Sequence, residues 1–532
     1  MSSNPTSAAV ALDRLSFTWP DGSPALEAVS GAFGAGRTGL VGRNGAGKST
    51  LLRLIAGELA PTSGVVTTSG EVATLPQRLT LDVDRRVAEL LGIAGPLDAV
   101  RAIAAGDVDP AHFDAVGDDW DVEARAEASL AEAGLSPAFL DRRVGELSGG
   151  EAVLVAIAGI RLRRAPITLL DEPTNNLDRG ARAALGRMVS SWKGALIVVS
   201  HDVSLLELMD DTAELYGNAL SVFGGPYSQW RAWLDAEQDA ARQAERDAAQ
   251  AMRKEKRQRI EAEVKLAHRA RTARKAEAEK RVPKIVAHGR RMAAEMSAGR
   301  LRTEVGAKED AARTALADAG RRVRSDATMS IELPDPGVSR TRRIATIGDG
   351  ERSWVLQGPE RAAVIGRNGA GKTTLLERVV AGTEPEDGVP GGVVHVEHVG
   401  YLRQRVDGLD EDGSVLAQVR DAAPHVPEKE LRNRLARFLV RGAAADRPVS
   451  ALSGGERFRV ALATLLLADP APQLVLLDEP TNNLDLDTVD QLVEALAAYR
   501  GAVLVVSHDD AFLDRLGIDL TLEIDDGRLR EA

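Results

Sequence analysis

The sequence contains no cysteine and no long hydrophobic run. The lack of cysteine excludes disulfide frameworks, cysteine-ligated zinc, iron–sulfur clusters and thiol catalysis, and it suits a reducing compartment. No stretch approaches the roughly 18 apolar residues of a membrane span, and the first ten residues lack a basic segment followed by an apolar one. We therefore expect a soluble, cytoplasmic protein without a membrane span.

The positive charge is concentrated in one segment of an otherwise acidic chain. The 532 residues, 44% of them hydrophobic, suffice for about three to five domains with buried cores, and they carry a net charge of −12. Residues 251–302 contain 17 Lys and Arg against 6 Asp and Glu, which is a local net charge of +11. One basic segment therefore separates two acidic bodies.

An internal repeat divides the chain into two copies with four motifs in the same order. The first copy has 22 extra residues before its LSGGE motif, and they are partly acidic. The repeat predicts domains at residues 1–230 and 331–532, joined by a linker at 231–330. The motifs are GRNGAGK[ST]T at 42–50 and 366–374, LSGGE at 147–151 and 452–456, LLDEPTNNLD at 169–178 and 476–485, and VVSHD at 198–202 and 505–509.

Short apolar runs precede these motifs in the first copy, at residues 38–41, 167–170 and 195–199. Runs of this length, rich in Val, Ile and Leu and alternating with helical stretches, indicate strands of a largely parallel sheet that is buried on both faces. We therefore predict an α/β fold that is duplicated within the chain.

The first motif matches the pattern G-x-x-x-x-G-K-[ST] in both copies. Its glycines let backbone N–H groups surround phosphate oxygens, the following helix adds a positive dipole, and the lysine neutralises phosphate charge. This predicts two ATP sites, with Ser49 and Thr373 as Mg²⁺ ligands. The candidate binding residues are Gly42, Arg43, Asn44, Gly45, Ala46, Gly47, Lys48, Ser49 and Thr50, and Gly366, Arg367, Asn368, Gly369, Ala370, Gly371, Lys372, Thr373 and Thr374.

Paired acids and a histidine follow apolar runs in each copy. Asp171 and Asp478 are candidates to hold the metal, and the next residues, Glu172 and Glu479, are candidates to orient or deprotonate the attacking water. The VVSHD motif places His201 and His508 within reach of a γ-phosphate, provided that their strand lies beside the strand with the acids.

With these motifs the chain resembles ATP-binding cassette proteins, specifically the ABC-F group of soluble twin-cassette ATPases that act on ribosomes. LSGGE is the signature of cassettes, and the resemblance implies a head-to-tail pairing of the two cassettes within a monomer, with each ATP between one glycine loop and the other copy's signature. One site would use Lys48, Ser49, Gln77, Asp171, Glu172 and His201 with Ser453, Gly454 and Gly455; the other would use Lys372, Thr373, Gln404, Asp478, Glu479 and His508 with Ser148, Gly149 and Gly150.

The resemblance also assigns further residues, and the two copies differ in some of them. Gln77 and Gln404 match the glutamine that senses the metal, and Trp19 matches the aromatic residue that stacks on adenine, although a core tryptophan is an equal alternative. The second copy has no obvious counterpart of Trp19, with Arg342 and Arg343 nearby instead. The first signature is followed by residues AVL at 152–154 and the second by RFR at 457–459, so we expect the second site to be slower or structurally biased.

The linker is predicted to be a helical hairpin with a basic tip at about residues 282–300. Residues 237–281 contain strong helix formers without Gly or Pro, Pro283 and Gly289 interrupt the pattern, and a second helical pattern begins at Leu301. A solvated charged face is the alternative for such a charge run. Candidate RNA contacts at this tip are Lys280, Arg281, Lys284, Arg290, Arg291, Arg300 and Arg302.

The resemblance implies that this linker enters the ribosomal exit site and touches peptidyl-tRNA near the peptidyl-transferase centre, with His288, Met292 and Met296 nearest by position. The leading hypothesis is an ATP-hydrolysing ribosome-associated factor that modulates translation or displaces antibiotics. An alternative is the ATPase motor of an exporter with a separate permease, which leaves the basic hairpin unexplained. A DNA-associated ATPase would need zinc modules or a far longer coiled coil, so no DNA partner is expected.

Overall fold

The computed structural model describes residues 8–75, 83–175, 177–278, 284–324, 333–404, 408–482 and 484–532, with backbone alone for residues 273, 274, 276–278, 284–291 and 294. The chain divides into two compact units. Met1–Tyr227 and Thr328–Ala532 form one unit, which holds both copies of the repeat, and Ser228–Ala327 form the other. Among the described residues, no helix is long and apolar enough to cross a membrane.

The first copy is built on a six-stranded sheet whose runs of Val, Ile and Leu are buried on both faces. Neighbouring strands are parallel except at the edge pair β8 and β9, and residues of β6 alternate between two hydrophobic cores, with Leu169 in one and Leu170 in the other. The predicted parallel α/β sheet is therefore confirmed. Its order is β5 (Val72–Thr74), β6 (Ile167–Asp171), β7 (Ala195–Val199), β3 (Arg37–Val41), β8 (Asp211–Tyr216) and β9 (Ala219–Gly224).

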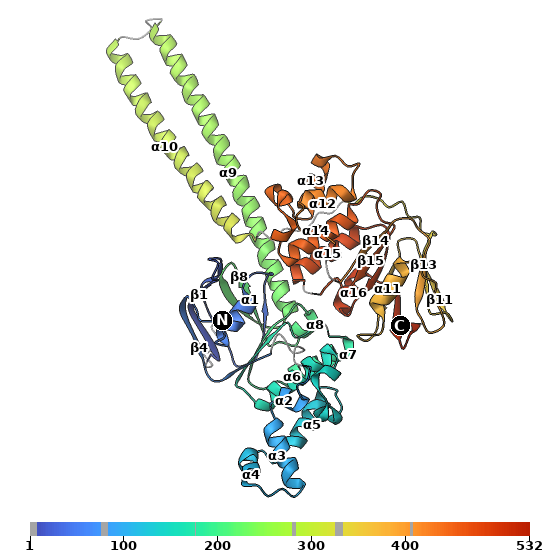
Figure 1. Cartoon of the computed structure of the whole chain (residues 1–532). Helices are drawn as coiled ribbons and strands as arrows, with labels where there is room; N and C mark the ends of the chain where they lie inside the picture. Colours follow the sequence, from blue (N-terminus) through green and yellow to red (C-terminus); the bar gives the residue numbers. More distant parts are fainter. Residues whose placement is uncertain are drawn as a thin grey trace. The chain divides into compact units, whose positions relative to one another are not determined.

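A second, antiparallel sheet accompanies it, in the order β2 (Pro24–Phe33), β1 (Val10–Thr18) and β4 (Ser63–Thr68), and the motifs alone did not predict this sheet. The helices of this copy include two, α3 and α4, that account for the extra residues before the signature (Figure 1). The helices of the first copy are α1 (Lys48–Ile55), α2 (Val87–Leu90), α3 (Ala94–Ala104), α4 (Pro110–Val116), α5 (Val122–Glu132), α6 (Gly149–Arg163), α7 (Arg179–Ser190) and α8 (Val203–Leu206), with 3₁₀ turns at Pro137–Asp141 and Val144–Glu146.

The second copy repeats this arrangement with fewer helices before its signature. Its six-stranded sheet has the order β14 (Val399–Leu402), β15 (Leu474–Asp478), β16 (Ala502–Val506), β12 (Arg361–Ile365), β17 (Leu520–Asp525) and β18 (Arg528–Glu531), and its small sheet has the order β11 (Ser353–Gln357), β10 (Arg343–Gly348) and β13 (Gly391–Val394). The helices are α11 (Lys372–Val380), α12 (Val415–Ala422), α13 (Glu428–Arg437), α14 (Gly454–Leu466), α15 (Leu486–Ala498) and α16 (Asp510–Leu516), with 3₁₀ turns at Gly442–Asp446 and Val449–Ala451.

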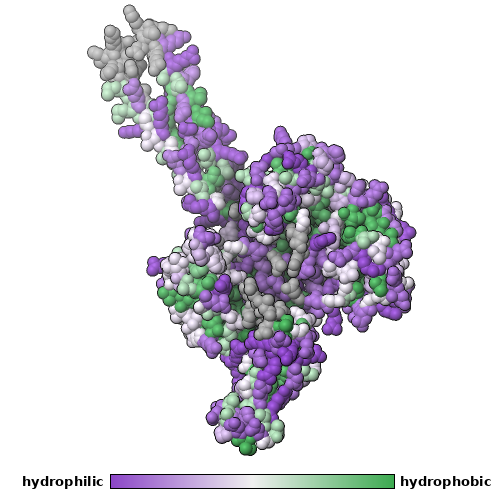
Figure 2. Space-filling model, viewed as in Figure 1, coloured by the Kyte–Doolittle hydropathy of each residue, from purple (hydrophilic) through white to green (hydrophobic). Residues whose placement is uncertain are grey.

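The linker unit contains two long helices, α9 (Tyr227–Ala278) and α10 (Lys284–Arg322), with a largely hydrophilic surface (Figures 1 and 2). Two contacts, one near the middle of the pair and one near its cassette end, show that the helices are antiparallel. Arg259 Nε lies 2.6 Å from Glu309 Oε2, and Gln238 Oε1 accepts a hydrogen bond from Arg324 N–H at 2.8 Å. Glu309 is only 6% exposed, whereas the Arg259 side chain is 41% exposed, so the carboxylate of this ion pair is buried and its arginine reaches the surface.

The predicted interruption at Gly289 is wrong, because α10 begins at Lys284 and continues through this residue without a break. A helical glycine costs about 1 kcal/mol relative to alanine. The strong helix formers that follow at residues 290–296 outweigh this cost, so most of the predicted tip is helix. The second helix therefore begins well before Leu301, where the sequence pattern placed it.

Candidate functional site

The two glycine loops have the same backbone conformation. Each begins directly after a central strand, β3 or β12, and its first glycine has φ of +148°. A Cβ atom at Gly42 would lie 2.5 Å from the Leu215 carbonyl oxygen, and one at Gly366 would collide with the Ile524 carbonyl oxygen. Gly47 and Gly371, with φ of +94° and +97°, cap the helices that follow, α1 and α11. These positions require glycine, and they aim a helix N-terminus at the loop.

The lysine of each loop folds back over it. Lys48 Nζ donates hydrogen bonds to the carbonyl oxygens of Gly42 at 2.6 Å and Arg43 at 3.2 Å. Lys372 Nζ donates equivalent bonds to Gly366 and Arg367, both at 2.9 Å. Burial lowers the pKa of both lysines because it disfavours the charged ammonium, nearby carboxylates act in the opposite direction, and each lysine lies between the glycine loop and the N-terminus of the following helix. This combination suits a polyphosphate.

The acidic motif and the histidine lie on neighbouring strands, as predicted. Strand β6 pairs in parallel with β7, with Asp171 opposite Val199, and β15 pairs with β16 in the same register. Because the carboxyl ends of parallel strands meet at one edge of a sheet, the acid at the end of β6 and the histidine after β7 come together there. The condition attached to the histidine prediction is therefore confirmed.

Glu172 and Glu479 share an uncommon backbone conformation. Their φ angles are +48° and +46°, in the left-handed region that costs a non-glycine residue about 1–2 kcal/mol. Each is held there by a hydrogen bond to the adjacent strand, from Glu172 N–H to the Val199 carbonyl at 2.8 Å and from Glu479 N–H to the Val506 carbonyl at 2.9 Å. The sheet therefore imposes a fixed position on both carboxylates.

Each of these glutamates contacts the histidine of its own copy. Glu172 Oε1 lies 3.1 Å from His201 Nε2, and Glu479 Oε1 lies 3.3 Å from His508 Nε2. Burial raises the pKa of Glu172 to about 8 and that of Glu479 to about 7, and it lowers the pKa of both histidines. A carboxyl group whose pKa lies near neutrality is poised to exchange a proton with water. His508 Nε2 also lies 3.1 Å from Asn368 Oδ1 of the glycine loop.

The oxygen donors at each site fit a magnesium ion. Thr373, which follows the lysine, is hydrogen-bonded through its side chain to the Asp478 carboxylate, and Ser49 and Asp171 are their counterparts in the first copy. Among the described residues no group of three His, Cys, Asp or Glu side chains could hold a metal. A hydroxyl and one carboxylate from the protein are typical of a Mg²⁺ site, because this ion keeps waters and substrate phosphates as its other ligands.

The predicted metal-sensing glutamines remain predictions. Gln404 is exposed two residues after the end of β14, and Gln77 lies outside the described residues.

A cavity of about 490 Å³ joins the elements of the first site. Its wall includes Trp19, residues 44, 45 and 47–50 of the glycine loop, Glu172 and His201. Trp19 is half-buried and also packs edge-on against Phe17, with ring centroids 5.0 Å apart. The tryptophan thus lies at the cavity and also contacts the core, which is compatible with both alternatives, and its stacking on adenine stays a prediction.

The second copy lacks an aromatic residue in the equivalent turn, but the comparison with Arg342 and Arg343 was misplaced. Those arginines lie at the beginning of β10, whereas Trp19 follows the end of β1. The β10–β11 turn holds Asp349, whose carboxylate accepts hydrogen bonds from the N–H groups of Arg352 and Leu529, both at 2.9 Å. The β10–β11 hairpin is shorter than the β1–β2 hairpin. A residue that precedes the second glycine loop by as many positions as Trp19 precedes the first therefore does not lie at the equivalent point of the fold.

Each glycine loop also contacts the end of the LLDEPTNNLD motif in the other copy. Asn44 N–H donates a hydrogen bond to Asp485 Oδ2 at 2.8 Å, and Asn368 N–H donates one to Asp178 Oδ2 at 3.4 Å. Sequence reasoning did not select these two aspartates as site residues. The signal was present, because both end a repeated motif and stand where a helix N-cap is expected.

The two signatures form capped helix N-termini. Ser148 and Glu151 make a capping box at the start of α6, and Ser453 and Glu456 make one at the start of α14. The serine and the first glycine are exposed in both copies, so the free N–H groups remain accessible to an anion. The residues after them differ as predicted: Leu154 is buried in the core, whereas its counterpart Arg459 carries a charge.

The predicted RNA contacts of the linker are described only in part. Arg300 and Arg302 are exposed on α10, and Met292 and Met296 are 54% and 62% exposed. For Lys284, His288, Arg290 and Arg291 only the backbone position on α10 is described, and Lys280 and Arg281 lie outside the described residues.

Comparisons with known proteins agree with this geometry. The family described as ABC transporter matches residues 26–175 and 351–482, one match in each copy. The tylosin resistance ATP-binding protein TlrC of Streptomyces fradiae is 34% identical over 519 residues, covering 91% of this chain and 92% of that protein. ABC transporter F family member 5 of Arabidopsis thaliana is 28% identical over 531 residues, covering 93% and 72%. This chain belongs to the ABC-F family.

As an ABC-F protein, the chain is an ATP-binding cassette ATPase with two nucleotide-binding domains. A crystal structure of the archaeal ribosome recycling factor aABCE1 with the stalk protein aP1 resembles it with a TM-score of 0.57 and 20% identity, covering 97% of this chain and 89% of that one. This likeness shows the twin-cassette fold.

Proposed function

We propose that this ABC-F ATPase acts on the ribosome. ATP binding closes the two cassettes, the basic hairpin engages ribosomal RNA and tRNA near the peptidyl-transferase centre, and hydrolysis releases the protein. The result is altered translation or displacement of a ribosome-targeting antibiotic. The observation that carries the proposal is the basic antiparallel hairpin, α9 and α10, which connects two complete ATP motifs in one chain.

The composition of the hairpin supports an RNA partner. Its exposed arginines suit contacts with phosphates, which give affinity and strong salt dependence without base specificity. The relative TlrC is a tylosin resistance protein by name, which supports the antibiotic form of the proposal. A separate permease would not need a charged hairpin of this kind, so the exporter motor is the weaker alternative.

The proposed hydrolysis gives each of these side chains a role, and the site geometry supports the assignment. Lys48 and Lys372 bind phosphate oxygens, Glu172 and Glu479 orient the attacking water and accept its proton, and the two histidines hold those carboxylates in place. Magnesium, held by Ser49 and Asp171 or by Thr373 and Asp478, would offset charge on the phosphates. The aspartates 178 and 485 and the exposed signatures Ser148, Gly149 and Gly150, and Ser453, Gly454 and Gly455, would complete the sites from the opposite copy.

The first test is co-sedimentation of the Glu172→Gln, Glu479→Gln double variant with purified ribosomes in ATP and in ADP. Loss of the general base slows the chemical step by about 10²–10⁴-fold while ATP binding is retained. We expect ATP-dependent accumulation on ribosomes and inhibition of translation. Release equal to that of the unchanged protein would contradict the mechanism, and absence of binding in both nucleotides would favour the exporter motor.

The linker is tested by reversing two exposed charges, Arg300→Glu with Arg302→Glu. If both arginines contact phosphates, the slope of log affinity against log salt falls by up to about 2. The matched control reverses Arg313 and Arg321, which lie on the same helix but already pair with acids of that helix. Equal effects of the two double variants would show that the contact is not at the predicted tip.

A further inference from the structure

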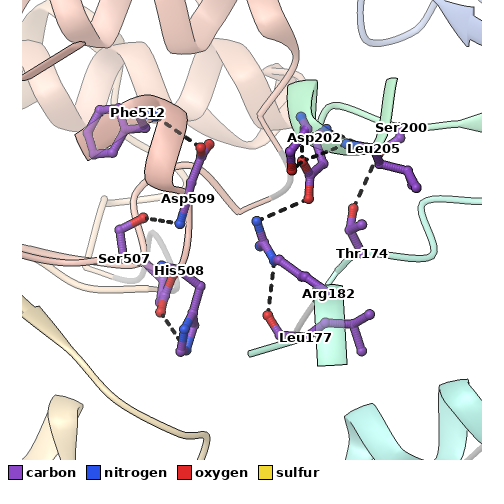
Figure 3. Close-up of polar contacts among 12 residues, drawn as sticks. Thr174, Leu177, Arg182, Ser200, Asp202, Leu205, Ser507, His508, Asp509 and Phe512 are labelled. Atoms are coloured by element: carbon purple, nitrogen blue, oxygen red, sulfur yellow. Dashed lines mark hydrogen bonds and ion pairs between the residues drawn. The ribbon is translucent and has the colours of Figure 1, made fainter. Parts of the chain in front are cut away.

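The two ATP sites are alike at the end that would hold the phosphates. Both glycine loops have the same backbone conformation, and the lysine of each folds back over its loop. The VVSHD loops also match, because Ser200 Oγ accepts a hydrogen bond from Asp202 N–H and Ser507 Oγ accepts one from Asp509 N–H, both at 3.1 Å (Figure 3). Asp202 and Asp509 each cap the helix that follows. Each copy therefore has the same set of groups for binding a polyphosphate.

The hairpin of β1 and β2 reaches the glycine loop of the first copy. It passes so close to Gly47 that an added Cβ atom there would lie 2.9 Å from the Ala25 carbonyl oxygen and 2.7 Å from Leu26 Cδ2. The end of this hairpin also forms one wall of the cavity at the first site. The residues that it contributes to this wall are Trp19, Ser23, Pro24 and Ala25.

The corresponding hairpin of the second copy, β10 and β11, is shorter. β11 has 5 residues, whereas β2 has 10. Phe33 ends β2 and Gln357 ends β11, and each lies nine positions before the first glycine of its loop, Gly42 or Gly366. The two strands therefore end at equivalent positions, and β11 has no counterpart of residues 24–28. These residues include the part of β2 that lies against the glycine loop.

The turn at the edge of each six-stranded sheet gives the same result. In the first copy Glu27 N–H donates a hydrogen bond to Asn218 Oδ1 of the β8–β9 turn at 3.3 Å. In the second copy Arg528, which begins β18, pairs with Glu351 at 3.1 Å. Glu27 lies within β2, whereas Glu351 lies in the turn between β10 and β11. The first hairpin thus extends past this edge turn, and the second hairpin ends beside it.

No residue of the second hairpin takes the place of the missing segment, and residues 343–357 are all described. Apart from its neighbours in the chain, a Cβ atom at Gly371 would have one described atom within 4 Å, Ile524 Cδ1 of β17 at 3.8 Å. Trp354 is the aromatic residue of this hairpin, and it is half-buried against the core of its own copy. The second site therefore has the groups for phosphates without a hairpin wall for a base.

We propose that the second site selects its nucleotide through the triphosphate alone and binds any nucleoside 5′-triphosphate, whereas the first site prefers adenine. Stacking on an aromatic ring adds affinity for a base, and a purine has more ring area than a pyrimidine. The first site gains this affinity from Trp19, and the second site does not. The inference rests on the proposed function only for the two ATP sites and the stacking on Trp19, and it does not depend on the ribosome as partner.

The experiment is equilibrium dialysis of the full-length protein, in Mg²⁺, with the β,γ-imido analogues of ATP and UTP, which are not hydrolysed. Lys372→Ala removes a phosphate ligand of the second site, so this variant reports the first site, and Lys48→Ala reports the second. We expect the ATP analogue to bind the first site about fivefold more tightly than the UTP analogue. At the second site the two dissociation constants should agree within about twofold.

Substitutions of the two tryptophans test the cause of this difference. Trp19→Ala in the Lys372→Ala protein should reduce the preference for the ATP analogue to less than about twofold, and Trp19→Phe should retain most of it. Trp354→Leu is the matched change in the second hairpin, made in the Lys48→Ala protein. It should leave the ratio of the two dissociation constants within about twofold, because this tryptophan packs against the core.

The outcomes separate this inference from the proposed function. Equal preferences at the two sites, no binding of either analogue at the second site alone, or a loss of affinity for the ATP analogue alone in Trp354→Leu would overturn the inference. If Trp354→Leu does not fold, as judged by thermal unfolding, the ratio measured for Lys48→Ala decides. Absence of binding at both sites would instead refute the two ATP sites on which the proposed function rests.

Discussion

Asp485 allows a quantitative test of the contact between the two copies, because Asp178 has the same local role and serves as an internal reference. Both aspartates cap the first turn of a helix through a backbone N–H group, and Asp485 also accepts a hydrogen bond from the Thr488 hydroxyl, which has no counterpart at Ala181. Asp485 accepts a hydrogen bond from Thr488 N–H at 2.9 Å at the start of α15, and Asp178 accepts one from Ala181 N–H at 2.9 Å at the start of α7. Removing either cap costs about 1 kcal/mol, so alanine substitutions share this loss.

The two aspartates differ in their contacts with the opposite glycine loop. Asp485 Oδ2 accepts from Asn44 N–H at 2.8 Å and is 7% exposed, whereas Asp178 lies 3.4 Å from Asn368 N–H, at the limit of a hydrogen bond. A hydrogen bond to a charged group contributes about 1.5–3 kcal/mol. Asp485→Ala should therefore cost about 2.5–4 kcal/mol in unfolding free energy, against about 1 kcal/mol for Asp178→Ala.

Thermal unfolding followed by circular dichroism measures this difference. For domains of this size, about 1 kcal/mol shifts Tm by about 2–4 °C. We expect a loss of about 2–4 °C for Asp178→Ala and of about 5–16 °C for Asp485→Ala, with Asp485→Asn in between because asparagine caps the helix but carries no charge. Equal shifts for the two alanine variants would refute the reasoning.

The same contact predicts a pH dependence. Burial acts to raise the pKa of Asp485, but hydrogen bonds from Asn44 and Thr488 outweigh it and hold the pKa below its usual value. A depressed pKa contributes stability that is present above the unfolded-state value, about 3.9, and is lost as the pH falls through the folded-state value. The difference in Tm between Asp485→Ala and the unchanged protein should therefore shrink below about pH 4.

Three further predictions follow from the nucleotide sites. Trp19→Ala should weaken binding of a fluorescent ATP analogue at the first site by about 0.5–1.5 kcal/mol, while Trp19→Phe should retain most of the affinity; equal losses would exclude stacking. Gly47→Ala should reduce ATP binding more than Gly371→Ala in the same titration. The added Cβ at residue 47 would lie 2.9 Å from the Ala25 carbonyl oxygen, whereas the one at residue 371 would lie 3.8 Å from the flexible Ile524 side chain. The reverse order of the two effects would contradict the geometry. Since Glu479 must lose its proton to act as a base and burial raises its pKa to about 7, the ATPase rate of the Glu172→Gln variant should fall as the pH drops through about 7, and a flat profile would refute that role.

The sequence predicted the nucleotide motifs of each copy because their chemistry is encoded locally. A glycine loop, a lysine and a helix N-terminus are contiguous in the chain, so their spacing alone indicates a phosphate site. The acids and histidines were predictable for a similar reason: each follows a buried apolar run, and parallel strands bring their carboxyl ends to one edge of a sheet. Local pattern failed at Gly289, where the strong helix formers that follow outweigh one glycine, and at Trp19, where hairpin length decides the equivalent position.

The duplicated α/β fold, the two glycine loops and the basic helical linker were determined by the sequence itself, through hydrophobic periodicity, glycine placement and charge. Tertiary structure alone decided which groups meet across the repeat. Asn44 and Asp485 are 441 residues apart, and nothing in the periodicity of either segment encodes their contact. The same holds for Asn368 and Asp178, which are 190 residues apart. Both contacts depend on the packing of separate elements around a shared site, and that packing follows from the summed fit of distant side chains.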